Sequence, residues 1–335
     1  MQDRLIFVIS PPRAGSTLLQ HMLGSHSQIL TYPEPHLITP LAFLGYYDLV
    51  DKAPYDHINA AEAIKLFVQG LPRGEADYLD AVRAYTDTLY GRMLSISDKR
   101  YFMDKTPGYA LVLPFLTKLY PDARYVVLTR HPLAIASSYA NSFFDGDWMA
   151  AHSFNPVVNR YVPAIADMLR TPPRHMLQVS YENLVQNPHR ELEAVCAFLA
   201  LDFQPSMVDY GEHYQAPRAG RGDPISVRRE TRPVATSVDK WAGELAGDPD
   251  KRALAEDIVA SLDPSDVELW GFEHAALLPH LNTEPGATTK PTKLKTNSFI
   301  LQRRIMLALK KDIRQRPHGK LVERLRYYCN VLLRE

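Results

Sequence analysis

The stretch that decides the fold is Ile6-Phe7-Val8-Ile9-Ser10-Pro11-Pro12-Arg13-Ala14-Gly15-Ser16-Thr17-Leu18-Leu19-Gln20. Its first residues are apolar and mostly β-branched, which favours a buried strand. A turn containing Pro and Gly follows, and a Ser-Thr pair then opens a helical pattern. A strand, a tight loop and a helix in this order are typical of sites where backbone N–H groups and the positive end of the helix bind a phosphate.

The loop differs in an informative way from the phosphate loop of nucleotidases, GxxxxGK(S/T). The frame here begins at Ser10 and ends with Gly15, Ser16 and Thr17, so serine replaces both the first Gly and the Lys. That Lys neutralises the β- and γ-phosphates of a nucleoside triphosphate, and its absence argues against ATP or GTP. The loop, with the cation Arg13 inside it, still indicates a site for one phosphate. The alternative is an ordinary strand-turn-helix unit in which Ser16 is only an N-cap.

The segment PPRAGSTLL, residues 11–19, resembles the 5′-phosphosulfate loop of sulfotransferases that use 3′-phosphoadenosine 5′-phosphosulfate (PAPS). It is most similar to the PRSGTTL form of tyrosylprotein sulfotransferases and of the sulfotransferase domains of bacterial polyketide pathways. The resemblance implies a P-loop-type three-layer α/β fold, with a central parallel sheet flanked by helices. It also implies that PAPS contacts the loop residues Arg13, Ala14, Gly15, Ser16, Thr17 and Leu18.

The pattern of the remaining chain predicts the same architecture. Further strands are expected over 101–107, 124–130 and 175–181, and prolines hold residues 26–36 extended. Helices are expected over 37–49, 60–70, 78–95, 109–119, 191–200 and 251–262, with another beginning at Pro132. Alternating strands and helices predict a parallel sheet covered on both faces. Ligands of such sheets bind at the carboxyl ends of the strands, where Ser10, Lys105, Arg130 and Tyr181 fall.

Arg130 and Ser138 form a second signal. Arg130 ends a predicted strand, and Ser138 lies eight residues later in the following helix, which brings the hydroxyl back over the strand end. An Arg and a hydroxyl make a suitable charge-assisted clamp for a phosphate, and the spacing matches the motif of the resembled family for the 3′-phosphate of PAPS. The alternative is that Arg130 forms an ion pair with an acidic residue at the surface. We assign no role to His131.

The resemblance implies that Glu34 is the catalytic base, because an acid lies 21 residues after the loop Arg in the tyrosylprotein group, as Glu34 does after Arg13. Glu34 would accept the proton of the acceptor hydroxyl, and His36 could share or replace that role. The sequence Glu34-Pro35-His36 differs from the Glu-Leu-His of the polyketide-pathway members, because Pro35 replaces the Leu. The alternative is that Glu34 caps the next helix and that His36 is a surface residue.

Three further motifs complete the predicted site. Asp104-Lys105-Thr106-Pro107 resembles the (N/D)K(T/D)P turn of the family. This resemblance implies that Lys105, together with Arg13, stabilises charge on the transferring sulfonate. The alternative is that Lys105 is a solvated residue at the end of a strand. Tyr181-Glu182-Asn183-Leu184-Val185 resembles YE(D/N/Q)LV, whose Tyr touches the nucleotide. By this resemblance the Tyr181 ring stacks on adenine. The alternative is that Tyr181 is merely a buried residue at the end of a strand. Arg221 and Lys240 belong to segments that resemble a loop near the end of the family's sequence, which folds over PAPS. The resemblance implies that both side chains reach the phosphates of PAPS.

Composition limits the function and the organisation of the 335 residues. A hydrophobic content of 46%, 23% charged residues and zero net charge fit a soluble globular protein without whole-molecule attraction to nucleic acid. Residues 290–335 nevertheless carry 13 Lys and Arg against 3 Asp and Glu, a net charge of +10, which leaves −10 for the rest. We expect a sulfotransferase domain over 1–280, a linker over 281–297 and a basic helical tail over 298–335. The tail could dock on the acidic body, on an anionic membrane surface or on an acidic partner.

Two cysteines cannot form a disulfide framework, and no signal peptide or long apolar run is evident, so we expect a cytoplasmic protein. No metal-ligand spacing appears among the His and Cys residues. The predicted function is transfer of the sulfuryl group of PAPS to an acceptor hydroxyl by in-line displacement, without a metal. The acceptor could be a small molecule, a lipid, a sugar or a carrier-bound chain. The alternatives are a P-loop kinase-like enzyme with a degenerate loop and a non-catalytic PAPS-fold binding protein.

Overall fold

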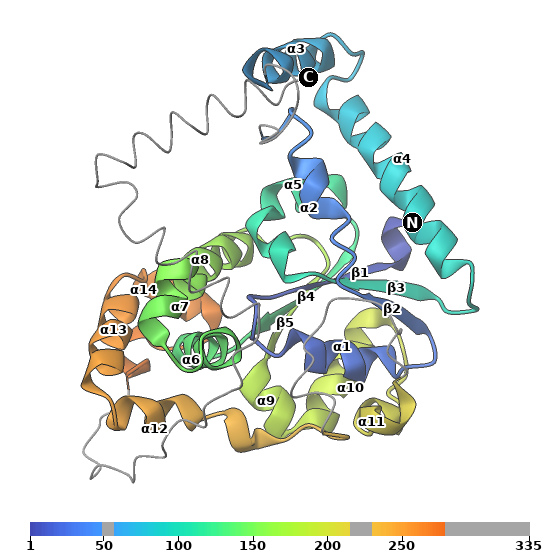
Figure 1. Ribbon diagram of the computed structural model, residues 1–335. Coiled ribbons are helices and arrows are strands. Elements are labelled where there is room, and N and C mark those ends of the chain that lie inside the picture. The colour runs from blue at the N-terminus through green and yellow to red at the C-terminus, as the bar shows by residue number, and fades with distance from the viewer. Residues whose placement is uncertain (49–56, 215–229, 279–335) are drawn as a thin grey trace.

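Five short strands form one sheet in the computed structural model, which describes residues 1–48, 57–214 and 230–278. The strands are β1 Leu5–Ile9, β2 Ile29–Pro33, β3 Tyr101–Lys105, β4 Arg124–Thr129 and β5 Met176–Ser180. The order across the sheet is β2-β3-β1-β4-β5, and every neighbouring pair is parallel (Figure 1). β1 therefore lies at the centre, and the carboxyl ends of all five strands meet at one edge.

The side chains of β1 divide the hydrophobic core between the two faces of the sheet. Phe7 and Ile9 belong to one cluster of buried residues, and Ile6 and Val8 belong to the other. All four are fully buried. Because alternate residues of a strand point to opposite faces, helices must cover both sides. The predicted three-layer α/β fold with a central parallel sheet is confirmed.

Apart from α3, the helices of the described residues fall into two groups by the face that they cover. The face that carries Val8 is covered by α1 Ser16–Gly24, α9 Tyr181–Gln186, α10 Pro188–Leu199 and α11 Tyr210–His213. The cluster that contains Phe7 draws on α2 Ile38–Ala42, α4 Glu75–Leu94, α5 Leu113–Leu119, α6 Pro132–Phe143, α7 Trp148–Phe154, α8 Val157–Arg170, α12 Lys240–Ala246, α13 Pro249–Ala260 and α14 Pro264–Trp270. Short 3-10 turns include η2 Pro107–Leu111 and η4 Ala235–Ser237.

The segment 26–36 contains an extended strand as expected, whereas two of the expected helices, over 37–49 and over 109–119, differ in the structure. The extended segment 26–36 contains the edge strand β2, so the helices expected after it lie between β2 and β3. The helix expected over 37–49 ends at Ala42, because the chain turns at Gly45, which has a φ of 97°, and the Asp48 N–H then bonds back to the Ala42 carbonyl. The helix expected over 109–119 is divided into η2 and α5, with Pro114 in the first turn of α5.

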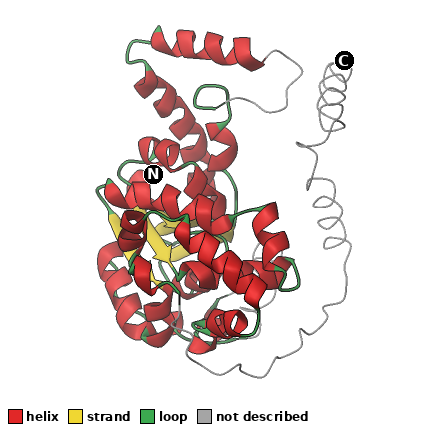
Figure 2. Cartoon of the chain, turned by 90° about the vertical axis from the view of Figure 1, so that its left-hand side faces the viewer, coloured by secondary structure: helices red, strands yellow, loops and turns green. Residues whose placement is uncertain are grey.

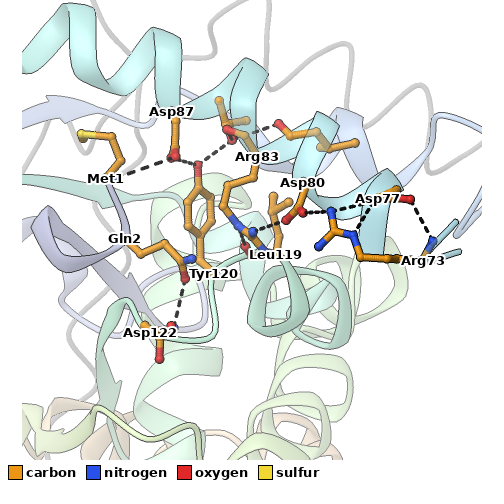
Figure 3. Close-up of polar contacts among 12 residues, drawn as sticks. Met1, Gln2, Arg73, Asp77, Asp80, Arg83, Asp87, Leu119, Tyr120 and Asp122 are labelled. Atoms are coloured by element: carbon orange, nitrogen blue, oxygen red, sulfur yellow. Dashed lines mark hydrogen bonds and ion pairs between the residues drawn. The ribbon is translucent and has the colours of Figure 1, made fainter. Parts of the chain in front are cut away.

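The helices α3 (His57–Gln69) and α4 form an arm that extends away from the sheet (Figures 1 and 2). Polar contacts hold α4 to the body of the molecule, as Figure 3 shows. The Arg83 side chain donates from Nε to the Leu119 carbonyl at 2.6 Å, and the Tyr120 hydroxyl donates to Asp87 at 2.9 Å. The base of the arm is therefore fixed to the residues around α5.

None of the helices in the described residues combines the length and the apolarity that crossing a bilayer requires. Cys196 is a buried free thiol, whereas Cys329 lies outside the described residues.

Candidate active site

A cleft of about 360 Å³ opens beyond the carboxyl ends of β1, β4 and β5. Its lining comes from the loop after β1 and the start of α1, from Arg130 after β4, from α6, from the start of α9, from Tyr210 of α11 and from residues between 230 and 241. The charged residues of this lining are Arg13, Arg130, Arg232, Lys240 and Glu230. Because the cations outnumber the single carboxylate, the described part of the lining favours an anionic ligand.

The loop after β1 supplies backbone donors to this cleft. Gly15 is the N-cap of α1, and no side chain caps the helix. The first N–H groups of a helix have no acceptor within it, and Gly15, Ser16, Thr17 and Leu18 all line the cleft. Ala14 is fully buried and does not belong to the lining, and its N–H donates to the Pro11 carbonyl at 3.4 Å. The alternative that Ser16 is merely an N-cap was wrong, because Ser16 is the first residue of the helix.

Gly15 is required at its position for two reasons. Its φ of 96° lies in the left-handed region, and a Cβ built on it would lie only 2.3 Å from Cδ2 of Tyr181. The Tyr181 ring also packs against Arg130, whose guanidinium carbon lies 4.2 Å from the ring centroid. Tyr181 is 6% exposed. Of the two sequence interpretations, these contacts favour the buried strand-end residue over an adenine platform, although Tyr181 does line the cleft.

Arg130 ties three segments together at the end of β4. Its Nη1 donates to the Arg13 carbonyl at 3.0 Å, and its Nη2 donates to the Ser237 carbonyl at 2.9 Å. Its Nε is buried and bonds to none of the described residues. Burial lowers the pKa of Arg130, and no carboxylate of the described residues lies within ion-pair distance. The alternative of a surface ion pair is therefore wrong within this part of the chain, and an anion in the cleft would stabilise the guanidinium.

Arg13 joins the loop to α6. Its Nε donates to the Ser138 hydroxyl at 3.3 Å, and its guanidinium carbon lies 5.8 Å from the centroid of the Phe143 ring. Arg130 and Ser138, which the sequence predicts as one clamp, therefore both contact Arg13 and line the same cleft. Helix α6 brings the Ser138 hydroxyl back to the strand end, as the spacing predicts.

A second group of predicted residues meets beside the cleft, where β2 and β3 end. Lys105 Nζ donates to Oε1 of Glu34 at 2.6 Å, because Pro33 lies opposite Lys105 in the sheet and Glu34 follows it. The Lys105 side chain is 1% exposed and that of Glu34 is 20% exposed. The alternative of a solvated Lys105 is wrong. The carboxylate compensates a cation that would otherwise be buried alone, which is costly.

His36 lies on the other side of the Glu34 carboxylate, with Nε2 3.9 Å from Oε2. The His36 side chain is 47% exposed, so solvent or a substrate can reach it. Helix α2 begins at Ile38 with Leu37 as N-cap, and no side chain caps it. The alternative that Glu34 caps this helix is therefore wrong. None of Glu34, His36 and Lys105 belongs to the lining of the 360 Å³ cleft.

Backbone strain is concentrated in these two groups. Among the described residues other than Gly, five have a positive φ, and three of them are Arg13 at 70°, Glu34 at 40° and His36 at 53°. Each such conformation costs on the order of 1–3 kcal/mol and persists where surrounding contacts impose it. The loop after β1 and the segment after β2 are both held in conformations that the isolated chain would avoid.

Helix α12 closes one side of the cleft. Its first residues, Lys240 and Trp241, both line the cleft, and the Trp241 ring stacks on His131 with 4.1 Å between centroids and 16° between planes. Glu244, one turn later, accepts hydrogen bonds from Ser137, Asn141 and Trp148 at 2.7–3.2 Å. The position of Lys240 therefore depends on contacts between α12, α6 and α7.

Sequence reasoning missed several residues of the cleft. Asn141 follows Ser137 by one helical turn, so helical spacing could have identified it from the serine pair. Residues 230–234 come from an irregular segment that no local pattern marks. Arg221 lies outside the described residues, as do the predicted linker and tail. No three His, Cys, Asp or Glu side chains in the described ranges are arranged to hold a metal ion.

Comparison with known proteins identifies the family of the chain. A model described as "Sulfotransferase family" matches residues 5–205. The nodulation protein NoeE of Sinorhizobium fredii (strain NBRC 101917 / NGR234) is 31% identical over 217 residues, which cover 59% of this chain and 50% of NoeE. Protein-tyrosine sulfotransferase 2 of Gallus gallus is 23% identical over 259 residues, which cover 73% of this chain and 64% of that protein. The chain thus spans about half the length of NoeE.

The same architecture occurs in a solved structure, the sulfotransferase domain of the Synechococcus PCC 7002 olefin synthase. That domain superposes with a TM-score of 0.52 and 24% sequence identity, over 80% of this chain and 93% of the domain. At 24% sequence identity, the similarity is evidence for the fold alone.

Proposed function

The chain belongs to the sulfotransferase family, whose model covers residues 5–205, and from that premise we propose that it transfers the sulfuryl group of PAPS to an acceptor hydroxyl. The observation that carries the proposal is the cationic cleft at the end of β1. There, the uncapped start of α1, Arg13, Arg130 and Ser138 lie together. A cleft of this kind suits a ligand with two separate anionic groups.

The two phosphates of the nucleotide have different partners in this proposal. The 5′-phosphosulfate contacts Arg13 and the backbone N–H groups at the start of α1, which are the first donors of a helix and face no internal acceptor. The 3′-phosphate contacts Arg130 and Ser138, with Lys240 as a further cation. The buried Nε of Arg130, which bonds to no described residue, supports this assignment. Arg221 remains a proposed phosphate contact on the family resemblance alone.

The catalytic step follows from the Lys105–Glu34 contact. The acceptor oxygen forms a bond to sulfur while the bond between sulfur and the nucleotide oxygen breaks, and 3′,5′-adenosine bisphosphate leaves. Glu34 takes the proton of the acceptor hydroxyl. Lys105 and Arg13 stabilise the charge that develops on the transferring group. As in phosphoryl transfer, positioning and electrostatics supply most of the rate enhancement.

The acceptor belongs to one of four classes: a small molecule, a lipid, a sugar or a carrier-bound chain that presents a hydroxyl. The basic segment 298–335 is the part of the chain that we propose for contact with an anionic membrane surface or an acidic partner. The protein is proposed to act in the cytoplasm. A kinase-like reaction fits the cleft less well, because Ser16 replaces the Lys that binds the β- and γ-phosphates.

Ligand binding tests the nucleotide assignment first. We expect 3′,5′-adenosine bisphosphate to raise the melting temperature of the chain, because a ligand of the native state stabilises it, and we expect ATP at the same concentration to raise it less. A larger stabilisation by ATP would contradict the proposal and favour the kinase-like alternative.

Transfer from ³⁵S-labelled PAPS then tests the reaction. The acceptor probes are N-acetyltyrosinamide, octan-1-ol, glucose and a pantetheine-linked β-hydroxyacyl chain. Glu34→Gln should lower turnover by about 10²–10⁴-fold and leave the affinity for 3′,5′-adenosine bisphosphate within about twofold. His36→Asn is the matched control and should keep most of the activity. An active Glu34→Gln variant beside an inactive His36→Asn variant would assign the base to His36 and contradict our assignment.

A further inference from the structure

The residue before Lys105 carries a buried carboxylate that the proposed reaction does not use. Asp104 is 0% exposed. Three hydroxyl groups donate to it: Tyr90 to Oδ2 at 2.7 Å, Tyr109 to Oδ2 at 2.9 Å and Thr106 to Oδ1 at 2.9 Å. Burial raises the pKa of Asp104 to about 6, and these hydrogen bonds oppose that rise. The carboxylate therefore organises a buried polar cluster directly beside the catalytic Lys105.

The two tyrosines of this cluster differ in one respect. The Tyr109 hydroxyl oxygen also accepts a hydrogen bond from the backbone N–H of Ile38 at 3.2 Å. The Tyr90 hydroxyl comes from α4, and among the described residues it bonds only to Asp104. Both side chains are almost completely buried, at 0% for Tyr109 and 2% for Tyr90. Only Tyr109 therefore links the Asp104 carboxylate to the segment that carries Glu34.

The Ile38 N–H needs this partner. Ile38 is fully buried and begins α2, which has no side-chain cap. An N–H at the start of a helix has no acceptor within the helix, and leaving it unpaired in the interior is costly. Ile38 lies four residues after Glu34 and two after His36, both of which hold a positive φ. The hydrogen bond to Tyr109 thus fixes the far end of a strained segment.

Glu34 is consequently held from two directions by consecutive residues of β3. Lys105 holds its carboxylate through the 2.6 Å ion pair. Asp104 holds its backbone through the Tyr109 hydroxyl and the Ile38 N–H. The turn η2, which carries Tyr109, also lies against His36, since a Cβ built on Gly108 would lie 3.8 Å from Cε1 of the His36 ring.

We propose that Tyr109, oriented by Asp104, is a positioning residue that sets the backbone of the Glu34 segment through Ile38, so that the base meets the acceptor hydroxyl at the required distance. The proposal rests on the function proposed above. Tyr109 touches neither the nucleotide nor the acceptor in this scheme. Its effect is on the alignment of the base, which should change kcat and leave nucleotide binding unchanged.

The test compares Tyr109→Phe with Tyr90→Phe, which remove one buried hydroxyl each from the same oxygen of Asp104. Initial rates are measured with ³⁵S-labelled PAPS and with N-acetyltyrosinamide and octan-1-ol as acceptor probes, and thermal midpoints are recorded for both variants. Tyr109→Phe should lower kcat by roughly 10- to 100-fold, as expected for a small misplacement of a catalytic group, with KM for PAPS within about twofold. Tyr90→Phe should keep kcat within about threefold at a similar loss in midpoint.

Hydrogen exchange of the backbone amides gives a second readout that needs no turnover. Tyr109→Phe should speed the exchange of amides in residues 34–39 by about tenfold or more, because the Ile38 N–H loses its acceptor, whereas Tyr90→Phe should leave these amides protected. Equal exchange and equal kcat in the two variants would make Tyr109 an ordinary core residue and overturn the proposal. If the wild-type chain transfers no sulfuryl group to either probe, the failure belongs to the proposed function, and amide exchange alone decides the role of Tyr109.

Discussion

Gly15 shows how a single position can combine a backbone requirement with a packing requirement. Its φ of 96° disfavours any side chain, and the Tyr181 ring occupies the space that a Cβ would need. Tyr181 in turn supports Arg130. A change at Gly15 should therefore propagate from the loop to the guanidinium that we assign to the 3′-phosphate.

We predict that Gly15→Ala lowers the free energy of unfolding by about 2 kcal/mol or more, because Ala is strained at positive φ and its methyl group clashes with Tyr181. The affinity for 3′,5′-adenosine bisphosphate should fall by about tenfold or more. Chemical denaturation and titration calorimetry measure both quantities. The matched control is Gly243→Ala in α12, where a Cβ meets nothing within 4 Å and where Ala should be neutral or stabilising. Equal effects at the two glycines would contradict the prediction.

His131 is a buried titratable group whose ring is stacked on Trp241 and lies edge-on to Phe272. Burial, together with the neighbouring Arg130, lowers the pKa of His131 to about 4 from its usual 6.5. The unfolded chain therefore binds a proton at a higher pH than the native chain does. The stability that the neutral ring contributes is present above pH 6.5 and is lost as the pH falls from 6.5 to 4.

We predict that the free energy of unfolding of the wild-type chain falls, relative to that of His131→Phe, by about 2–3 kcal/mol between pH 7 and pH 4. Phe keeps the aromatic stack and removes the titration. Urea denaturation of both chains across this pH range provides the measurement. Parallel pH profiles for the two chains would show that His131 does not titrate as described.

The spacing of Arg130 and Ser138 predicted that both residues lie at one site. The prediction was possible because they belong to a strand and to the helix that directly follows it, and the geometry of such a unit is local. The Lys105–Glu34 ion pair was not predictable in the same way. It exists because β2 pairs with β3, so that Pro33 lies opposite Lys105. No local sequence pattern predicts which strands are neighbours in the sheet. The link from Tyr109 to Ile38 was missed for the same reason.

At the scale of elements, one carboxylate joins α12 to two neighbouring helices. Glu244 accepts hydrogen bonds from Ser137 and Asn141 of α6 and from Trp148 of α7. The sequence predicted that Lys240 approaches the phosphates, but it gave no sign of this anchor, since an isolated Glu on a short helix normally faces solvent. The packing of three helices decides its role.

We predict that Glu244→Ala lowers the free energy of unfolding by about 2 kcal/mol, since three donors lose a charged acceptor, and weakens the binding of 3′,5′-adenosine bisphosphate by roughly tenfold because Lys240 and Trp241 shift. Denaturation and calorimetry again provide the values. Glu256→Ala on α13, which removes an exposed ion pair with Arg252, is the control and should change stability by less than about 0.5 kcal/mol. Unchanged nucleotide affinity in Glu244→Ala would refute the anchoring role.

Helix α2 illustrates the limit of periodicity at the same scale. Apolar residues over 37–49 suggested one long helix, yet the helix ends at Ala42 and the chain turns at Gly45. Tyr46 and Tyr47 then pack against Tyr78 of α4, with 4.5 Å and 6.3 Å between ring centroids. Contacts with a distant helix therefore outweighed the local preference.

At the scale of the whole molecule, the described residues place helices on both faces of the sheet. Both hydrophobic clusters are built from residues within 1–278, and so is the lining of the cleft in the part that the structure describes. The opposite net charges of residues 290–335 and of the remaining chain mark a chemically distinct segment. We propose that residues 281–335 are separate from the catalytic unit.

We predict that a chain ending at His280 keeps the thermal midpoint of the full chain within about 2 °C and its affinity for 3′,5′-adenosine bisphosphate within about twofold, because the residues that form the described core and the described part of the cleft all precede residue 281. Differential scanning calorimetry and titration of both chains supply the comparison. A large loss of stability or affinity would instead assign the tail to the folded domain.

The most direct measurement is a crystal structure of the full chain with 3′,5′-adenosine bisphosphate. The 5′-phosphate should lie against Arg13 and the start of α1, and the 3′-phosphate should accept hydrogen bonds from Arg130 and the Ser138 hydroxyl. Density for the nucleotide outside the cleft at the end of β1, or an Arg130 guanidinium turned away from it, would contradict both the phosphate assignment and the reaction built on it.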